Sequence, residues 1–293
     1  MRSVAAEYEL VSPGTLAAVL QMLASEPGKW TPIAGGTELM VQFGAGRLAS
    51  RNLVSIWNLG ELRGFGEAAD SLRIGAGCTY TDLRRHSIVA GEFPLLAKSA
   101  GWTGGIANQN RGTLGGNIVN GSPAADSCPA LLVYDAEVEI ASVRGSRRVP
   151  YAKFHTGYKK SVLAPDELLS AVHLRRRFAS HRHYLRKVGP RNAQAISKVA
   201  LAGVGRLRDG IVDDLRIAVA SMSNAPARCE KTEAALLGRG LTHAAISAAR
   251  AAMAAEWTPL DDIRSTAEYR AHVAGNLLEE FLSGLLASQG PSA

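Results

Sequence analysis

Two glycine-rich stretches have the residue types and spacing that best suit the binding of a small molecule. Residues 33–38 read Ile-Ala-Gly-Gly-Thr-Glu, and residues 112–117 read Gly-Thr-Leu-Gly-Gly-Asn. Glycine has no Cβ and tolerates positive φ, so the backbone N–H groups of such turns can point together at an anion. Thr37, Thr113 and Ser122 would add hydroxyl donors. We therefore predict that both turns close on one phosphate-bearing ligand; the alternative is two unrelated tight turns.

The second stretch is followed by Ser-Pro-Ala-Ala-Asp at residues 122–126, which supplies its one acid. An ionised carboxylate only accepts hydrogen bonds, so Asp126 would suit a pair of ribose hydroxyls. The alternative role for Asp126 is a helix N-cap before Cys128 and Pro129, and one residue can hold both roles. Asn117 also has an alternative role, because it can brace the loop instead of contacting the ligand.

No other pattern in the sequence indicates a catalytic site. A G-x-S-x-G turn, a G-x-x-x-x-G-K-[ST] phosphate loop and a G-x-G-x-x-G dinucleotide fingerprint are all absent. His181 and His183 would share one face of a strand, as two metal ligands would, but no third ligand lies nearby in the sequence. We interpret this pair as part of an exposed basic strand, and we assign no catalytic acid or base.

The composition is that of an ordinary globular protein. The chain has 293 residues, of which 46% are hydrophobic and 20% charged, with a net charge of +7. Its basic residues are spread along the chain, which argues against a nucleic-acid partner. The three cysteines form no CxxC pair, so neither a disulfide framework nor an iron–sulfur cluster held by this chain alone is expected. With no signal peptide and no apolar run that could span a membrane, we expect a cytoplasmic soluble protein.

The residues around the first glycine turn predict a small β-α-β unit. Ser12 and Pro13 have the types preferred at a helix N-cap and in the first turn, and apolar residues follow at helical spacing as far as Leu23. Strands are expected at 30–34, which runs directly into the turn, and at 53–56.

The middle of the chain is predicted to hold strands at 72–77, 136–141 and 167–174, with short helices near Thr81, Pro94 and Ala130. Residues 104–126 are polar and glycine-rich, and we expect a long functional loop there. Two alternating runs between 198 and 220 flank Asp209-Gly210, a type I′ hairpin signal. Helices at 242–255 and 266–286 would form a layer on this hairpin sheet.

Taken in order, these stretches resemble the FAD-binding medium subunit of the molybdenum hydroxylases, the family that includes xanthine dehydrogenase, carbon monoxide dehydrogenase, and the quinoline and nicotinate oxidoreductases. The resemblance lies in residues 33–39 (IAGGTEL), in 111–118 (RGTLGGNI) with 122–126 (SPAAD), in 166–170 (DELLS), and in 186–188 (RKV) with 194–199 (QAISKV). The order and spacing hold over nearly the whole chain.

The resemblance implies an α+β fold. Two α/β subdomains of the vanillyl-alcohol-oxidase type, at residues 1–57 and 58–177, would hold FAD, and a C-terminal α+β domain would follow at 178–293. It places a leucine near the flavin ring and a lysine close to the flavin, and Ile196 and Trp102 are candidates for stacking on the ring. The implied FAD-binding residues are Ile33, Ala34, Gly35, Gly36, Thr37, Glu38, Leu39, Gly112, Thr113, Gly116, Asn117, Val119, Asn120, Ser122, Ala125, Asp126, Leu169 and Lys198.

The resemblance also implies a role in electron transfer. A large molybdopterin subunit would hydroxylate an N-heterocycle, a purine or an aldehyde, and a small subunit would carry electrons over two [2Fe–2S] clusters. This chain would pass the electrons through FAD to an external acceptor, which could be NAD⁺, a quinone, O₂ or a carrier protein. The three chains are expected to form a dimer of heterotrimers.

Two alternative functions are a self-contained FAD-dependent oxidase of the same wider fold and a scaffold that holds no flavin. The oxidase is disfavoured because the sequence offers no base near a plausible pocket and no evident residue for covalent flavin attachment. Carbon monoxide dehydrogenase members carry histidine where this chain has Thr37, so carbon monoxide is a less expected substrate. The cysteine-rich insert of benzoyl-CoA reductase-like members is absent.

Overall fold

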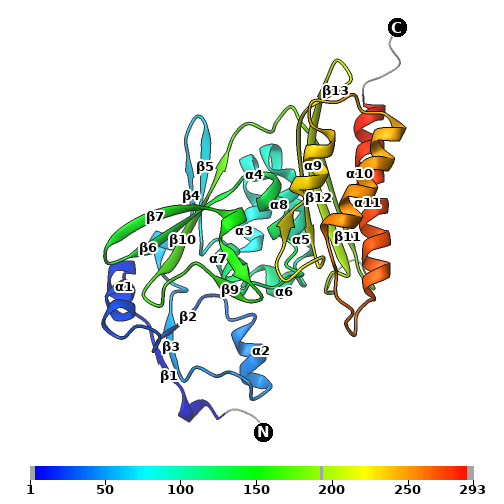
Figure 1. Cartoon of the computed structure of the whole chain (residues 1–293). Coiled ribbons are helices and arrows are strands. Elements are labelled where there is room, and N and C mark those ends of the chain that lie inside the picture. Colours follow the sequence, from blue (N-terminus) through cyan, green and yellow to red (C-terminus); the bar gives the residue numbers. More distant parts are fainter. Residues whose placement is uncertain (1–3, 192–193, 289–293) are drawn as a thin grey trace.

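The computed structural model describes residues 4–191 and 194–288, and it confirms the α+β class. Three main sheets lie along the chain in sequence order, with helices between the second and third sheets and on the outer side of the third (Figure 1). Short 3₁₀ helices occur at Ala5–Glu7, Gly60–Leu62 and Tyr151–Lys153. None of the helices in the described ranges combines the length and apolar character that crossing a membrane requires.

The N-terminal sheet carries the first glycine turn at the end of an edge strand. Its strands β1 (Glu9–Val11), β3 (Asn52–Ser55) and β2 (Thr31–Ile33) lie in that order and are parallel. The helices are α1 (Leu16–Ser25), which follows β1, and α2 (Leu39–Gly44), which follows the turn and was not predicted.

Helix α1 begins later than the sequence pattern suggested. Its N-cap is Thr15, whose Oγ1 accepts a hydrogen bond from the N–H of Ala18 at 3.2 Å. The predicted start at Ser12 and Pro13 is therefore wrong. The physical reason is that two good capping residues lie three positions apart, and the side chain that reaches a helical N–H decides between them.

The middle sheet is antiparallel and five-stranded. Its order is β4 (Phe65–Glu67), β5 (Ser71–Gly75), β10 (Leu168–Arg175), β6 (Glu137–Ser142) and β7 (Gly145–Pro150). A separate small hairpin, β8 (His155–Gly157) with β9 (Lys160–Ser161), follows β7. The predicted strands at 72–77, 136–141 and 167–174 are confirmed as β5, β6 and β10 within a few residues.

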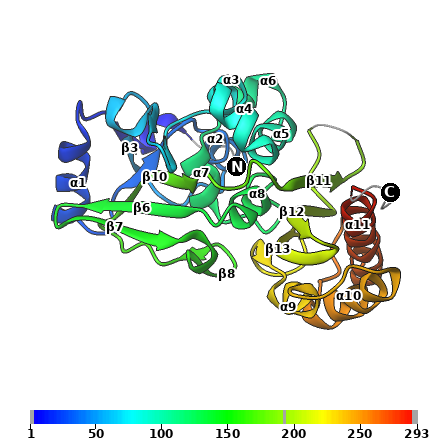
Figure 2. The ribbon, with the colours of Figure 1, turned by 90° about the horizontal axis from the view of Figure 1, so that it is seen from above.

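Six helices follow β5 and fill the space between the middle and C-terminal sheets. They are α3 (Tyr80–Arg85), α4 (Ser87–Glu92), α5 (Pro94–Trp102), α6 (Ile106–Gln109), α7 (Leu114–Asn120) and α8 (Cys128–Val133). Helix α7 packs against β10, whereas α5 and α8 pack against the C-terminal sheet. Viewed from above, that sheet and its outer helices lie on the far side of α8 from β6 and β7 (Figure 2).

The long loop predicted at residues 104–126 is wrong, because α6 and α7 lie within it. Helix α7 has a regular start, with Thr113 Oγ1 accepting a hydrogen bond from the N–H of Gly116 at 3.1 Å. It ends at Gly121, which has a φ of 60° in the left-handed region that glycine favours at helix ends. Gly115 and Gly116 of the motif therefore belong to a helix rather than to an irregular loop.

The C-terminal sheet carries the predicted hairpin. Its strands are β11 (Arg182–Val188), β12 (Val199–Arg208), β13 (Ile211–Ala220) and β14 (Ala227–Arg228), and its helices are α9 (Glu230–Leu236), α10 (His243–Glu256) and α11 (Ala267–Ala287). Asp209 and Gly210 have φ values of 52° and 76°, as a type I′ turn requires. The hairpin and both long helices are confirmed. A strand was expected at His181 and His183, and β11 begins at Arg182 and continues to Val188.

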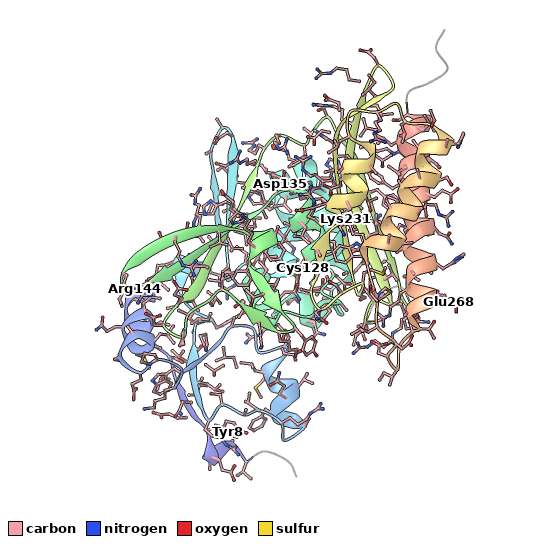
Figure 3. The ribbon with its side chains drawn as sticks, in the orientation of Figure 1. Tyr8, Cys128, Asp135, Arg144, Lys231 and Glu268 are labelled. Atoms are coloured by element: carbon pink, nitrogen blue, oxygen red, sulfur yellow. The ribbon has the colours of Figure 1, made fainter. Side chains whose placement is uncertain are left out.

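Asp135 connects the middle of the chain to the C-terminal sheet. It follows α8 and lies close to β13 and α9 (Figure 3). Its carboxylate accepts hydrogen bonds from Arg177 at 2.9 Å, Arg216 at 3.2 Å and Arg228 at 2.8 Å. The apolar core around α3–α8 also extends into β12 through Ala202 and Val204. The boundary at 177/178 therefore stays a prediction.

We expect Gly203→Ala to lower the free energy of unfolding by about 1–3 kcal/mol. A Cβ at this position of β12 would lie 2.4 Å from Cε1 of Phe281, a fully buried residue of α11, so the helix would have to shift. The control is Gly91→Ala on the exposed side of α4, where nothing lies within 4 Å of the added carbon. Chemical denaturation should show a neutral or slightly stabilising effect for the control. Equal stabilities of the two variants would contradict the close packing of α11 on β12.

Candidate functional site

The two predicted glycine turns are in direct contact. A Cβ at Gly35 would lie 1.7 Å from the carbonyl oxygen of Arg111 and 3.2 Å from the nitrogen of Gly112. No side chain fits in that space, because contacts of real Cβ atoms are essentially never closer than 3.0 Å. The structure therefore brings together two stretches that lie more than seventy residues apart in the sequence.

The first turn presents a run of free backbone donors. Gly36 has a φ of 76°, which turns the chain sharply after β2. Within the described part of the chain, the N–H groups of residues 34–38 make no hydrogen bond. None of these residues is buried, so their donors face water or a ligand. A run of adjacent free N–H groups is suited to an anion such as a phosphate.

The second turn is fixed to the end of β5 by its backbone. The N–H groups of Leu114 and Gly115 donate to the carbonyls of Cys78 at 2.9 Å and Ala76 at 2.8 Å. A Cβ at Gly115 would lie 2.6 Å from the Cβ of Ala76, so this glycine is required for packing. Gly116, in contrast, is exposed at the start of α7. The two glycines of the motif therefore have different roles.

Asp126 is part of a buried ion pair and is not a helix cap. Ser127 is the N-cap residue of α8, so the alternative cap role for Asp126 is wrong. The Asp126 carboxylate accepts hydrogen bonds from Lys187 Nζ at 2.6 Å and Ser197 Oγ at 2.7 Å. Burial raises the pKa of the Asp126 carboxyl, while the Lys187 ammonium and the Ser197 hydroxyl act in the opposite direction. Both partners come from the C-terminal sheet region, which therefore contributes to the site.

Among the other predicted residues of 117–125, two make side-chain hydrogen bonds within the protein. Asn117 Oδ1 accepts a hydrogen bond from Ser127 Oγ at 2.7 Å, so Asn117 braces α7 against α8. Ser122 Oγ accepts a hydrogen bond from the N–H of Ala124 at 3.3 Å and shapes its own turn. The others differ in exposure: Val119 is exposed, Asn120 is partly buried and Ala125 is buried.

Glu38 and Leu39 are the last two predicted residues of the first stretch, and their side chains have different surroundings. Glu38 accepts a hydrogen bond from Gln42 at 3.1 Å and lies 3.8 Å from the ammonium of Lys159. Leu39 is the first residue of α2 and is partly buried. Glu38 therefore links the turn to the β8–β9 hairpin.

Leu169, a residue of β10, belongs to the same buried cluster as Leu114 of the second turn, whereas Lys198 contacts α11. Leu169 is buried in the core beneath β10, next to a bulge in its pairing with β6. Lys198 directs its ammonium toward the ring of Tyr269 on α11, 5.2 Å from the ring centroid. Their roles toward a ligand stay predictions.

Lys187 lies in the RKV stretch of the resemblance but was not among the predicted site residues, although it pairs with Asp126. Its side chain is only 4% exposed, and its ammonium lies at the centre of the Asp126 pair. The sequence of β11 could have indicated that Lys187 is buried, since residues two apart in a strand lie on the same face. Lys187 thus shares a face with Leu185, a buried core residue, whereas Arg186 points to Glu280 of α11 at 3.9 Å.

A strand does form here, since His183 lies in β11, but the expectation that the two histidines are exposed is wrong. His181 is 7% exposed and pairs with Asp214 at 3.1 Å, and burial lowers the pKa of His183 to about 4. His183 is half-buried, and its ring lies 5.8 Å from that of Tyr134, which directly follows α8. Among the described residues, no group of three or more His, Cys, Asp and Glu side chains is placed to hold a metal ion.

Two family models match consecutive parts of this chain. Residues 6–175 match the FAD binding domain in molybdopterin dehydrogenase, and residues 184–285 match the C-terminal domain of the CO dehydrogenase flavoprotein. Together the matches include both glycine turns, Asp126 and Lys187.

Individual relatives match over nearly the whole length. The chain is 35% identical over 280 residues to the xanthine dehydrogenase FAD-binding subunit of Escherichia coli O157:H7, covering 94% of this chain and 95% of the relative. It is 27% identical over 276 residues to the carbon monoxide dehydrogenase medium chain of Hydrogenophaga pseudoflava, covering 94% and 96%. A solved structure of carbon monoxide dehydrogenase from that organism, lacking the Mo-pyranopterin moiety of its cofactor, superposes with a TM-score of 0.91 at 28% identity, covering 96% of this chain and 98% of that one.

We expect Lys187→Met to lower the free energy of unfolding by about 3–5 kcal/mol at pH 7, because the buried Asp126 carboxylate would keep only the Ser197 hydroxyl and lose its charged partner. A second change, Asp126→Asn, should restore part of the loss. The control is Arg144→Met, which removes an ion pair with Asp166 in which the arginine side chain is 61% exposed. It should lower the stability much less than Lys187→Met does, because water screens an exposed charge.

The cost of Lys187→Met should also depend on pH in a defined direction. Without the ammonium, the pKa of the folded-state Asp126 carboxyl rises further above its unfolded value. The loss of unfolding free energy is then fully present above the pKa of Asp126 in the folded variant. It is absent below the pKa of Asp126 in the unfolded chain, near 4. Denaturation series at several pH values should show the difference from wild type shrinking as the pH falls, and a constant difference would contradict the ion-pair assignment.

Proposed function

We propose that this chain, which belongs to the family of FAD-binding medium subunits of the molybdenum hydroxylases, carries electrons from metal centres in partner subunits to an external acceptor. A small subunit would deliver electrons from its [2Fe–2S] clusters, while a large molybdopterin subunit hydroxylates an N-heterocycle, a purine or an aldehyde. The three chains would assemble as a dimer of heterotrimers. Support for partner chains comes from relatives that are themselves described as medium chains or FAD-binding subunits.

The observation that carries this proposal is the contact between Gly35 and the Arg111 carbonyl. It puts the free N–H groups of residues 34–38 beside the turn that opens α7. A pyrophosphate has two linked anionic groups and needs donors from more than one side. Thr37 is exposed, and the Thr113 hydroxyl accepts a bond from Gly116 and keeps its own hydrogen to donate. This donor set fits the pyrophosphate of FAD.

Bound FAD would supply a ring that takes up and releases electrons at a potential set by its surroundings. The protein's part is to hold and orient it. Each oxygen of the Asp126 carboxylate accepts one bond from the protein and retains capacity for a ribose hydroxyl. Lys187 is the lysine that we place closest to the flavin, in preference to Lys198, because it pairs with Asp126. Ile196 is 52% exposed and is our candidate for the flavin ring.

The chemistry of the cysteines is consistent with metal centres in other chains. Cys78, Cys128 and Cys229 are all buried, and burial raises the pKa of the Cys78 and Cys128 thiols to about 11 and about 12. A metal-binding cysteine must be a thiolate, which these surroundings disfavour. We therefore assign to this chain the flavin alone, held by residues 1–57 and 58–177, with 178–293 closing the site.

The purified chain should bind one FAD with the two-banded visible spectrum of a protein-bound flavin. Apoprotein titrated with FAD, followed by absorbance and by quenching of flavin fluorescence, gives the stoichiometry and the dissociation constant. Protein that stays colourless after titration would contradict the proposal. Oxidation of a small substrate by the chain alone, without partner subunits, would favour the self-contained oxidase instead.

Gly35→Ala should abolish FAD loading while leaving the chain folded. The added carbon would meet the backbone of the second turn, which cannot give way as a flexible side chain can, so the two turns must separate. Gly14→Ala, in the same N-terminal region with nothing within 4 Å of the new carbon, should bind FAD normally. Flavin content after reconstitution is the measurement, and equal content in both variants would rule out a site formed by the contact of the turns.

A further inference from the structure

Trp57 makes an unusual pair of contacts just outside the proposed flavin site. It lies after β3, and the guanidinium carbons of Arg111 and Arg63 are 3.9 Å and 4.2 Å from its ring centroid. Arg63 Nη2 also donates to the Trp57 carbonyl at 2.7 Å. We call these three side chains the Trp57 stack. Each cation–π contact is an electrostatic attraction between the guanidinium and the face of the ring.

The Trp57 stack bridges the two glycine turns. The N–H of Ile56 donates to the carbonyl of Ile33 at 3.0 Å, so Trp57 lies one residue beyond the pairing that ends β2, where the first turn starts. Arg111 directly precedes the second turn, and its carbonyl is the atom that lies against Gly35. One residue therefore contacts the first turn through its main chain and Trp57 through its side chain.

The contact between the turns has little else to hold it. Within the described ranges, no hydrogen bond joins residues 33–39 to residues 111–117. The ion pair of Glu38 with Lys159 is 3.8 Å long, and the side chains are 47% and 42% exposed, so it is a weak tie. The turns thus touch without attracting one another strongly, and the Trp57 stack supplies an attraction at their junction.

We propose that the Trp57 stack is a positioning device that holds the two glycine turns at the spacing needed for FAD, with Trp57 and Arg111 as its positioning residues. This inference rests on the proposed function, since it assigns to the stack control over the affinity of that same site. When only part of the apoprotein has the turns together, the apparent dissociation constant is the intrinsic constant divided by that fraction. Loss of the stack lowers the fraction and weakens binding without removing any group that touches the flavin.

Trp57→Leu should raise the FAD dissociation constant about 5- to 30-fold, since one to two kcal/mol of stacking is lost and 1.4 kcal/mol corresponds to tenfold. Trp57→Phe keeps an aromatic face and should recover most of the affinity. Arg111→Met should weaken binding by a smaller factor. The Trp57→Leu/Arg111→Met double variant should be little weaker than Trp57→Leu, because both changes remove the same contact.

The matched control is Arg51→Met. Arg51 also lies on an aromatic ring of the N-terminal region, 4.5 Å from the centroid of Tyr8, but its contact does not reach the second turn. FAD titration of apoprotein gives the dissociation constant of each variant, and thermal unfolding of the apoprotein gives its stability. Arg51→Met should lose a similar amount of stability and keep the wild-type affinity for FAD.

The results separate this inference from the proposed function. Wild-type chain that binds no FAD would overturn the proposed function. Wild-type affinity in both Trp57→Leu and Arg111→Met would overturn the inference alone, as would an equal loss of affinity in Arg51→Met, or a Phe variant no better than the Leu variant. If Trp57→Leu does not fold, Arg111→Met and Trp57→Phe decide the question by the same titration.

Discussion

The close approach of Gly35 to the carbonyl of Arg111 is the constraint on which the proposed site depends. Each partner is fixed by a different sheet: the first turn leaves the edge of the N-terminal sheet, and the second is hydrogen-bonded to the chain just after β5. Only glycine permits the contact, because any Cβ would overlap the opposing backbone. At Gly35 the missing side chain matters more than backbone flexibility, because its φ is an ordinary one. Gly35 therefore tolerates substitution as poorly as Gly36, whose φ is positive.

The C-terminal sheet region contributes to the proposed site through an ion pair and a hydrogen bond to Asp126. Lys187 and Ser197 reach Asp126 from a sheet that is also connected to α8 through Asp135 and three arginines. Buried ion pairs contribute little net stability when intact, but removal of one partner leaves a costly unpaired charge. The buried Lys187–Asp126 pair therefore disfavours any arrangement in which β11 is shifted away from Asp126.

The sequence was sufficient to predict the features that depend on local spacing. The glycine turns, the Asp209-Gly210 hairpin and the long C-terminal helices follow from residue type and periodicity, and all appear in the structure. Helix α7 was missed because its glycines were interpreted as loop residues, although Thr113 and Gly121 have the types expected at its two ends. The partner of Asp126 could not be predicted in this way, since Lys187 is 61 residues away and only the packing of β11 brings it there.

The arrangement has a consequence for how cofactor and fold depend on each other. The proposed flavin contacts come from the N-terminal turn, from the α7–α8 segment and from the C-terminal sheet, so no one region holds the whole site. A ligand that binds only the assembled state stabilises it in proportion to the logarithm of its concentration over its dissociation constant. FAD bound at the junction would then add its binding energy to the contacts between regions, which include the apolar packing of α5 and α8 on the C-terminal sheet, the ion pairs and the close glycine contact. By the reciprocity of linked equilibria, FAD binding and the contacts between these regions would then stabilise one another.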